Sequence, residues 1–218
     1  MASNQQVDVA IIGGGVIGAA IAYFLSQRGL QTVVIEGTQI AHGASGKAAG
    51  LLSPGLPHYD DAELLEPLLT RSIELHQRFA ELLNGPVYYL YRRYETCLIA
   101  RNDEEVASLH ERASQLNAKP VAPEEIPRRF PWLDRPVAGG LAQLTAQLDC
   151  KRFTHQLLET ATKLGASLHR ATAIGLVGGD NSIDGVKLQD GSVIRAKSTV
   201  IAMGPWSLQA AQWLDLPI

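Results

Sequence analysis

Residues 7–36 read VDVAIIGGGVIGAAIAYFLSQRGLQTVVIE, which predicts a strand, a glycine-rich turn, a helix and a second strand. Residues 8–12 are apolar and rich in β-branched side chains, as is typical of a strand buried on both faces. A helix is expected from about Val16, Gly29 ends it, and residues 31–35 form the next buried strand. The stretch therefore predicts the first β-α-β unit of a parallel sheet.

The turn carries the glycine pattern of a dinucleotide site. Gly13, Gly15 and Gly18 form G-x-G-x-x-G between the predicted strand and helix. We expect Gly13 to permit the tight turn, Gly15 to let the backbone approach a pyrophosphate, and Gly18 to let the helix pack closely on the strand. The alternative is that the glycines serve packing alone. The agreement of strands, helix and spacing favours a dinucleotide.

Two further features of the stretch suit the same ligand. The pyrophosphate would lie on the free N–H groups at the positive end of the helix, at Val16 and Ile17. Glu36 ends the second strand, where a carboxylate accepts both hydroxyls of the adenosine ribose and repels a 2′-phosphate. The motif alone does not choose between FAD and NAD.

Bulk properties exclude several other functions. The 218-residue chain has a formal net charge of −3 and a pI near 6.1, so nothing indicates a nucleic-acid partner. Residues 9–25 carry no charge, but the glycine turn interrupts them and no basic segment precedes them, so we expect protein core and no membrane span. Cys97 and Cys150 are isolated, which suits a reducing compartment and a cytoplasmic location. The six histidines show no metal-binding spacing, so no metal site is expected.

The segment after Glu36 departs from the usual continuation with a third parallel strand. Residues 38–57 are rich in Gly, Ala and Ser, and the small residues of 42–54 would let the backbone lie against a planar ligand. Ser45 offers a hydroxyl, and Lys47 a cation, to a phosphate or a reduced flavin. A flexible surface loop and a solvated lysine are the alternatives. The departure favours FAD.

The middle of the chain predicts a different architecture. We expect a long amphipathic helix over 63–83, two strands over 87–93 and 96–100, a helix from Asn102 to about 117, and a strand over 139–146. Asp149 then begins a helix that reaches about residue 164. Four short runs then predict a β-meander, at 167–168, 173–177, 183–188 and 193–195. A buried strand over 199–204 follows and is expected to return under the nucleotide.

Together these motifs resemble the FAD-dependent oxidoreductases of the D-amino-acid oxidase superfamily, most closely the glycine oxidase and sarcosine oxidase branch. The resemblance covers nearly the whole chain. It is carried by GGGVIG at 13–18 with Glu36, GASGKAAGLL at 43–52, YRRY at 91–94, LDCKR at 148–152 before GA at 165–166, and VIAMGPWS at 200–207. Cys150 stands where relatives often have proline, and Lys47 stands where a glycine oxidase carries a small residue.

The resemblance implies roles by position. Glu36 would hold the adenosine ribose, and Ser45 would cover the pyrophosphate and flavin together with the backbone of Ala48, Ala49, Gly50 and Leu51. Because Lys47 departs from the family pattern, its place on the flavin side is a hypothesis that the resemblance does not carry. Ile174 would present its backbone to adenine. Ala202 and Gly204 would pass beneath the nucleotide.

The resemblance also implies the organisation of the fold. We expect an α/β chain with a Rossmann-like FAD-binding domain, built from a parallel sheet and a β-meander over 1–85 and 149–218, and part of an α+β substrate domain over 86–148. Family members continue past this length and there supply the remaining substrate-domain strands, a substrate-clamping arginine and the last loop around the flavin. No catalytic residue is therefore expected within this chain, because in this family the flavin accepts the hydride.

The implied activity is FAD-dependent oxidation of the C–N bond of a small amine or amino acid, of the glycine, sarcosine or D-amino-acid type. One alternative is a dehydrogenase of the same fold that uses an acceptor other than oxygen. A second is a truncated, non-catalytic FAD-binding or interaction protein. The substrate, the acceptor, covalent or non-covalent flavin attachment and the oligomeric state stay open.

Overall fold

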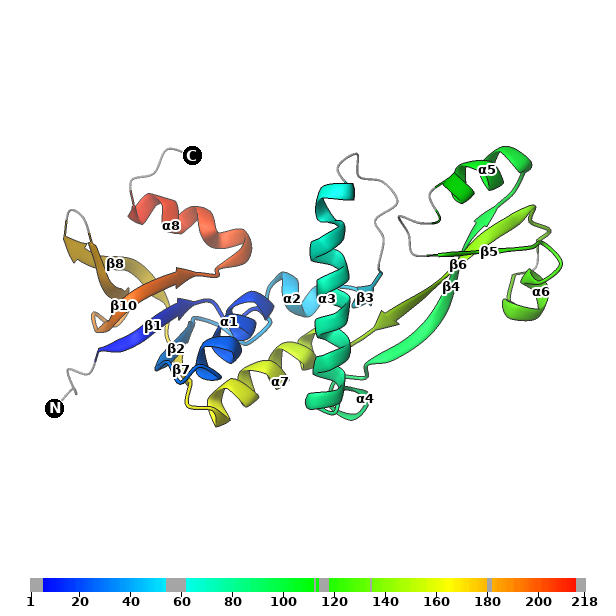
Figure 1. The fold of residues 1–218 in the computed structure, drawn as a ribbon. Coiled ribbons are helices and arrows are strands. Elements are labelled where there is room, and N and C mark those ends of the chain that lie inside the picture. The colour runs from blue at the N-terminus through cyan, green and yellow to red at the C-terminus, as the bar shows by residue number, and fades with distance from the viewer. Residues whose placement is uncertain are drawn as a thin grey trace. The chain divides into compact units, whose positions relative to one another are not determined.

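The chain folds into two compact units in a computed structural model (Figure 1). The structure describes residues 6–53, 62–111, 113, 118–133, 135–179 and 182–214. The first unit joins residues 1–49 with 149–218, and the second comprises residues 50–148. Both ends of the chain thus build one unit, and the second unit is an insertion into it.

A six-stranded sheet forms the centre of the first unit. Its spatial order is β7-β2-β1-β10-β9-β8. The four strands from β7 to β10 run parallel, whereas β10, β9 and β8 form an antiparallel meander. The strands are β1 (Val7–Ile12), β2 (Thr32–Glu36), β7 (Ser167–Arg170), β8 (Ala173–Gly179), β9 (Ser182–Leu188) and β10 (Val193–Ile201).

Helices pack on this sheet through small and apolar side chains. Helix α1 (Val16–Ser26) buries Gly18, Ala19 and Ala22, and it packs on β1, β2 and helix α7 (Cys150–Lys163). As predicted, Asp149 caps α7, because its Oδ1 accepts a hydrogen bond of 2.9 Å from the Arg152 N–H. Three short helices complete the unit: α2 (Ala44–Lys47), the 3-10 helix η1 (Gly204–Trp206) and α8 (Ser207–Trp213).

The second unit is an antiparallel sheet with helices. Strand β6 (Gly139–Gln147) pairs along its length with β4 (Arg92–Ala100), and also with β3 (Leu51–Leu52) and β5 (Lys119–Val121). Its helices are α3 (Ala62–Leu82), α4 (Gly85–Tyr88), α5 (Asp103–Glu111) and α6 (Ile126–Arg129). A small core of Val121, Ile126, Phe130 and Ala142 lies beneath β5 and β6.

The fold class agrees with the sequence prediction, but the first boundary between the units does not. Residues 50–85 belong to the second unit, whereas the predicted boundary lay at 85. The reason is that β3 pairs with β6, and the Leu148 N–H donates to the Gly50 carbonyl at 3.0 Å. The second boundary lies between 148 and 149, where it was predicted. The FAD and substrate roles of the two units stay predictions.

Two element predictions in the second unit need comment. A first strand over 87–93 is wrong, because residues 85–88 form α4 after Asn84 adopts a left-handed conformation (φ 49°), and one strand then covers 92–100. The helix capped by Asn102 begins as predicted, since the Asn102 Oδ1 accepts from the Glu105 N–H at 2.9 Å. The predicted end of this helix, at about residue 117, lies outside the described residues. Residues 54–57 of the predicted small-residue loop lie outside them as well.

The predicted meander differs from the observed one at both ends. The run at 167–168 is part of β7, which pairs in parallel with β2 and supplies the third parallel strand. The runs at 193–195 and 199–204 belong largely to one strand, β10, which is antiparallel to β9 at its start and parallel to β1 beyond. No helix in the described part of the chain is long and apolar enough to cross a membrane.

Candidate dinucleotide site

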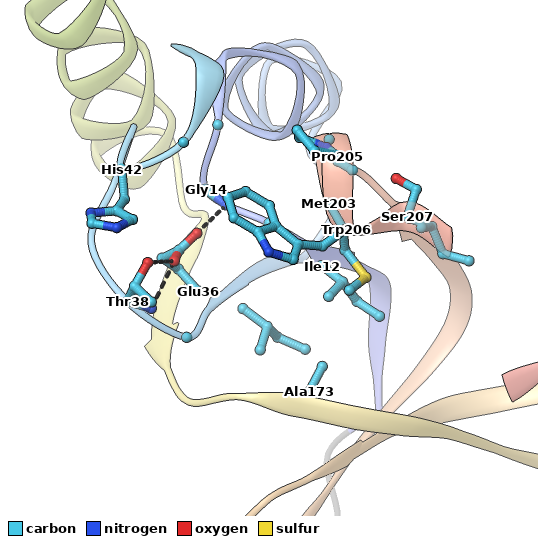
Figure 2. A pocket seen from close by; sticks show the side chains of 18 of the residues that line it. Ile12, Gly14, Glu36, Thr38, His42, Ala173, Met203, Pro205, Trp206 and Ser207 are labelled. Carbon is cyan, nitrogen blue, oxygen red and sulfur yellow. Dashed lines mark hydrogen bonds between the residues drawn. The ribbon is translucent and has the colours of Figure 1, made fainter. Parts of the chain in front are cut away.

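A cavity of about 520 Å³ opens in the first unit at the carboxyl ends of the parallel strands (Figure 2). Its lining comes from residues within 12–17, 35–45, 171–173 and 201–209, which follow or end β1, β2, β7 and β10. Ligands of open α/β sheets bind at this edge, outside the carboxyl ends of the strands. The volume lies in the usual range for small-molecule pockets, about 300–1,000 Å³.

The glycine-rich turn forms one wall of the cavity. Gly13 has φ +113°, and a Cβ there would collide with the Ala202 carbonyl oxygen at the end of β10. A Cβ on Gly18 would collide with the Gly13 carbonyl oxygen and lie 3.3 Å from Cγ2 of Ile11. The predicted roles of Gly13 in the tight turn and of Gly18 in close helix–strand packing are therefore confirmed.

Gly15 differs from Gly13 and Gly18 because there is space around the position that its Cβ would occupy. A Cβ there would find only Ser45 Oγ within 4 Å, at 3.1 Å. The fold would therefore accept a side chain at this position, and Gly15 leaves space beside the first turn of α1. Close approach of a ligand to the backbone is the use that this space suits.

The start of α1 is an anion-binding surface. The Val16 N–H donates to Ser45 Oγ at 2.9 Å, so α2 brings the Ser45 hydroxyl to the positive end of α1. The first N–H groups of a helix have no partner inside the helix, and the aligned peptide dipoles add a partial positive charge there. A hydroxyl and first-turn amides together suit a phosphate.

Glu36 is fixed at the edge of the cavity by three donors (Figure 2). Its Oε2 accepts from the Gly14 N–H at 2.8 Å, and its Oε1 accepts from the N–H and Oγ1 of Thr38 at 2.7 and 2.8 Å. A carboxylate has about four lone-pair sites, and these donors occupy three of them. About one site, on Oε2, is therefore left to accept a hydroxyl of a ligand. Accepting both ribose hydroxyls would require Thr38 to release one of its two bonds.

The structure brings together about half of the predicted cofactor residues. Those that line the cavity are Gly13, Gly15, Ile17, Glu36, Ser45, Ala202 and Gly204. Val16 does not line the cavity, and its N–H donates to Ser45 Oγ, while Gly18 packs against the Gly13 carbonyl behind the turn. The cofactor role of Val16 stays a prediction.

The other predicted residues lie outside the cavity lining. Lys47, Ala48 and Ala49 are exposed beyond the end of the segment that lines it. Gly50 and Leu51 belong to the second unit, where Leu51 is exposed. Ile174 is 44% exposed and does not line the cavity, whereas the preceding Thr172 and Ala173 do. The cofactor roles of all these residues stay predictions.

Sequence reasoning missed two parts of the lining. Ala171, Thr172 and Ala173 follow β7, whose parallel pairing with β2 was not predicted. Pro205 and Trp206 belong to the segment VIAMGPWS at 200–207, but no site role was predicted for either residue. The available signal was the glycine-ended strand, since residues just beyond the carboxyl end of a parallel strand meet the ligand.

Comparisons with known proteins agree with this geometry. The family model described as FAD dependent oxidoreductase matches residues 8–218. The aerobic glycerol-3-phosphate dehydrogenase of Staphylococcus haemolyticus is 27% identical over 222 residues, covering 93% of this chain and 39% of the relative. A putative oxidoreductase of Saccharomyces cerevisiae is 38% identical over 121 residues, covering 52% of this chain and 22% of the relative.

A solved structure shows the same fold. The glycine oxidase of Bacillus cereus superposes with a TM-score of 0.81 at 26% identity, over 95% of this chain and 58% of that one. The chain thus spans less than two thirds of the length of each of these relatives. Because the family match covers residues 8–218, the chain belongs to the FAD dependent oxidoreductases, and its cofactor is FAD.

Proposed function

We propose that the chain is the FAD-binding part of an enzyme that oxidises the C–N bond of a small amine or amino acid. The observation that carries the proposal is the cavity, where a glycine turn, a helix N-terminus and a fixed carboxylate meet. The choice of a C–N bond is supported by the likeness to a glycine oxidase at 26% identity. When bound, FAD would supply the redox chemistry, as acceptor of a hydride from the α-carbon of the substrate.

The residues of the first unit would bind and orient the cofactor. The amides at the start of α1 and the Ser45 hydroxyl would hold the pyrophosphate. Glu36, held by Gly14 and Thr38, would accept a ribose hydroxyl without having to reorient. Ile12, Ile35 and Ala173 add apolar lining that keeps water from these polar contacts.

Glu36→Gln is expected to weaken FAD binding about 10- to 100-fold, because hydrogen bonds to a charged group contribute about 1.5–3 kcal/mol. The amide would also place an NH₂ against the N–H donors of Gly14 or Thr38. Titration of the protein with FAD, followed by flavin fluorescence, measures the change.

The control for that substitution is Glu159→Gln. This exposed carboxylate lies on α7 of the same unit, and its Oε1 forms an ion pair of 2.8 Å with Lys163 Nζ. FAD affinity should be unchanged in the control. Equal affinities of Glu36→Gln and the unsubstituted protein would contradict the assignment of Glu36 to the ribose.

A second candidate is a dehydrogenase that passes electrons to an acceptor other than oxygen. It is favoured by the 27% identity to an aerobic glycerol-3-phosphate dehydrogenase over 93% of this chain. In that case the substrate would be a small alcohol phosphate, and a C–O bond would be oxidised. The fold and the FAD site are common to both candidates.

The two candidates predict different reductants of the flavin. The purified protein is mixed anaerobically with glycine, sarcosine, D-alanine or glycerol 3-phosphate while its visible flavin band is recorded. We expect bleaching by an amine and recovery of the band when air is admitted. Bleaching by glycerol 3-phosphate alone, with recovery only on adding a dye acceptor, would establish the second candidate. A flavin that none of these compounds bleaches would indicate that this chain binds FAD without catalysing either reaction by itself.

A further inference from the structure

Trp206 and Gly43 are in direct contact at the cavity. Both residues line it, Trp206 from η1 after β10 and Gly43 from the residue that precedes α2. A Cβ built on Gly43 would lie 2.8 Å from Cζ3 and 3.1 Å from Cη2 of the indole, with no other atom within 4 Å outside its chain neighbours. The Trp206 ring therefore rests edge-on against the backbone at Gly43.

The indole adds an aromatic surface to the cavity that the polar groups of the site also line. Figure 2 shows the Trp206 ring on the side of the cavity that Pro205 and Ser207 also line, and Gly14 and Glu36 line the same cavity. Trp206 is 48% exposed even though its ring edge is packed. An open aromatic face in a pocket is a surface on which a planar ring can stack.

Gly43 leaves room for the indole. Its backbone has φ −81° and ψ −141°. Any side chain at position 43 would meet the indole and push it from its place. Gly43 is thus a positioning residue for Trp206.

We propose that Trp206 binds the dinucleotide by packing its indole against the adenosine half, beside the ribose assigned to Glu36. The inference rests on the proposed binding of FAD in this cavity. Stacking of an aromatic side chain on a base predicts that its removal weakens binding about 5- to 150-fold.

A double-mutant cycle tests the proposal. FAD affinity is measured for Trp206→Ala, Gly43→Ala, the double variant and the unsubstituted protein. We expect both single variants to bind FAD more weakly, Trp206→Ala by about 5- to 150-fold. In the Trp206→Ala background, Gly43→Ala should change the affinity less than about twofold, because the added methyl then has no neighbour to displace.

Controls separate a binding role from a folding role. Trp132→Ala removes an exposed tryptophan of the second unit and should leave FAD affinity unchanged. Trp206→Phe keeps an aromatic ring and should retain part of the affinity. Thermal unfolding followed by circular dichroism identifies variants that are not folded, and the Trp206→Phe and Gly43→Ala variants carry the test if Trp206→Ala does not fold.

Binding of ADP identifies the half of the dinucleotide involved. If Trp206 contacts the adenosine half, Trp206→Ala weakens ADP binding by the same factor as FAD binding. Unchanged ADP affinity would overturn the assignment to adenosine, and unchanged FAD affinity in folded Trp206→Ala would overturn the proposal entirely. Failure of the unsubstituted protein to bind FAD would instead contradict the proposed function, so the two failures are distinct.

Discussion

Gly15→Val is expected to abolish FAD retention while the first unit stays folded. Gly15 has φ −78° and ψ −179°, which valine adopts readily, and a Cβ there meets only Ser45 Oγ at 3.1 Å. The branched side chain would, however, fill the space through which a pyrophosphate reaches the start of α1. The ratio of flavin absorbance to protein absorbance in the purified variant measures retention, and circular dichroism measures folding.

Gly179→Val is the matched control for this substitution. Gly179 ends β8 and has nothing within 4 Å of a built Cβ, and it does not line the cavity. We expect this variant to retain FAD in full. A Gly15→Val protein that carried as much flavin as the control would show that the pyrophosphate does not pass Gly15.

Gly18→Val is expected to prevent stable folding of the first unit. A Cβ on Gly18 collides with the Gly13 carbonyl oxygen and approaches Cγ2 of Ile11, so α1 would have to move away from β1. Overpacking at a buried contact of this kind costs about 3 kcal/mol or more. Urea denaturation without added FAD measures the loss as a lower midpoint or as the absence of a folded baseline.

Ala20→Val on the same helix is the control, because Ala20 is only partly buried. Its cost should stay near the difference in helix propensity, below about 1 kcal/mol. The Gly15 and Gly18 variants thus separate two roles within one motif, since the first should lose the flavin and the second the fold. A Gly18→Val protein with an unchanged midpoint would contradict the packing role.

The sequence predicted those parts of the fold whose determinants are local. Strands β1 and β2 and helix α1 follow from contiguous periodicity within 7–36, and the three glycines of the pattern fall within six residues between the first strand and the helix. Helix α7 was equally clear, since Asp149 supplies its cap and an apolar face follows. These elements were predicted to within one or two residues at their starts.

The parts that were missed depend on pairing between distant segments. The two-residue run at 167–168 is too short to reveal a parallel partner, yet Leu168 pairs with Val34 and makes β7 the third parallel strand. Residues 50–53 show no pattern that would assign them to the second unit, because β3 depends on its partner β6. Which strands pair with each other is decided by tertiary contacts, and the β-propensity of a short segment does not encode it.

The candidate site shows the same division. Gly13, Gly15 and Glu36 were identified because one contiguous unit places them together. Gly43 and Trp206 are 163 residues apart in the sequence, so the local sequence around either residue does not indicate the contact between them. A glycine in a small-residue segment is typical of a loop. Only the fold shows that a side chain at position 43 would collide with the ring of Trp206.

The pairing of β1 with β10 has a consequence for biosynthesis. Asp8 and Lys197, whose side chains form a 2.7 Å ion pair across these strands, are 189 residues apart. At about 5–20 residues per second a ribosome needs roughly 10–40 s to add that length. During this interval one edge of the apolar strand β1 has no native partner, so the nascent chain carries an aggregation-prone edge. The cavity at the carboxyl ends of the parallel strands, which includes residues up to Gln209, is completed only after β10 has emerged.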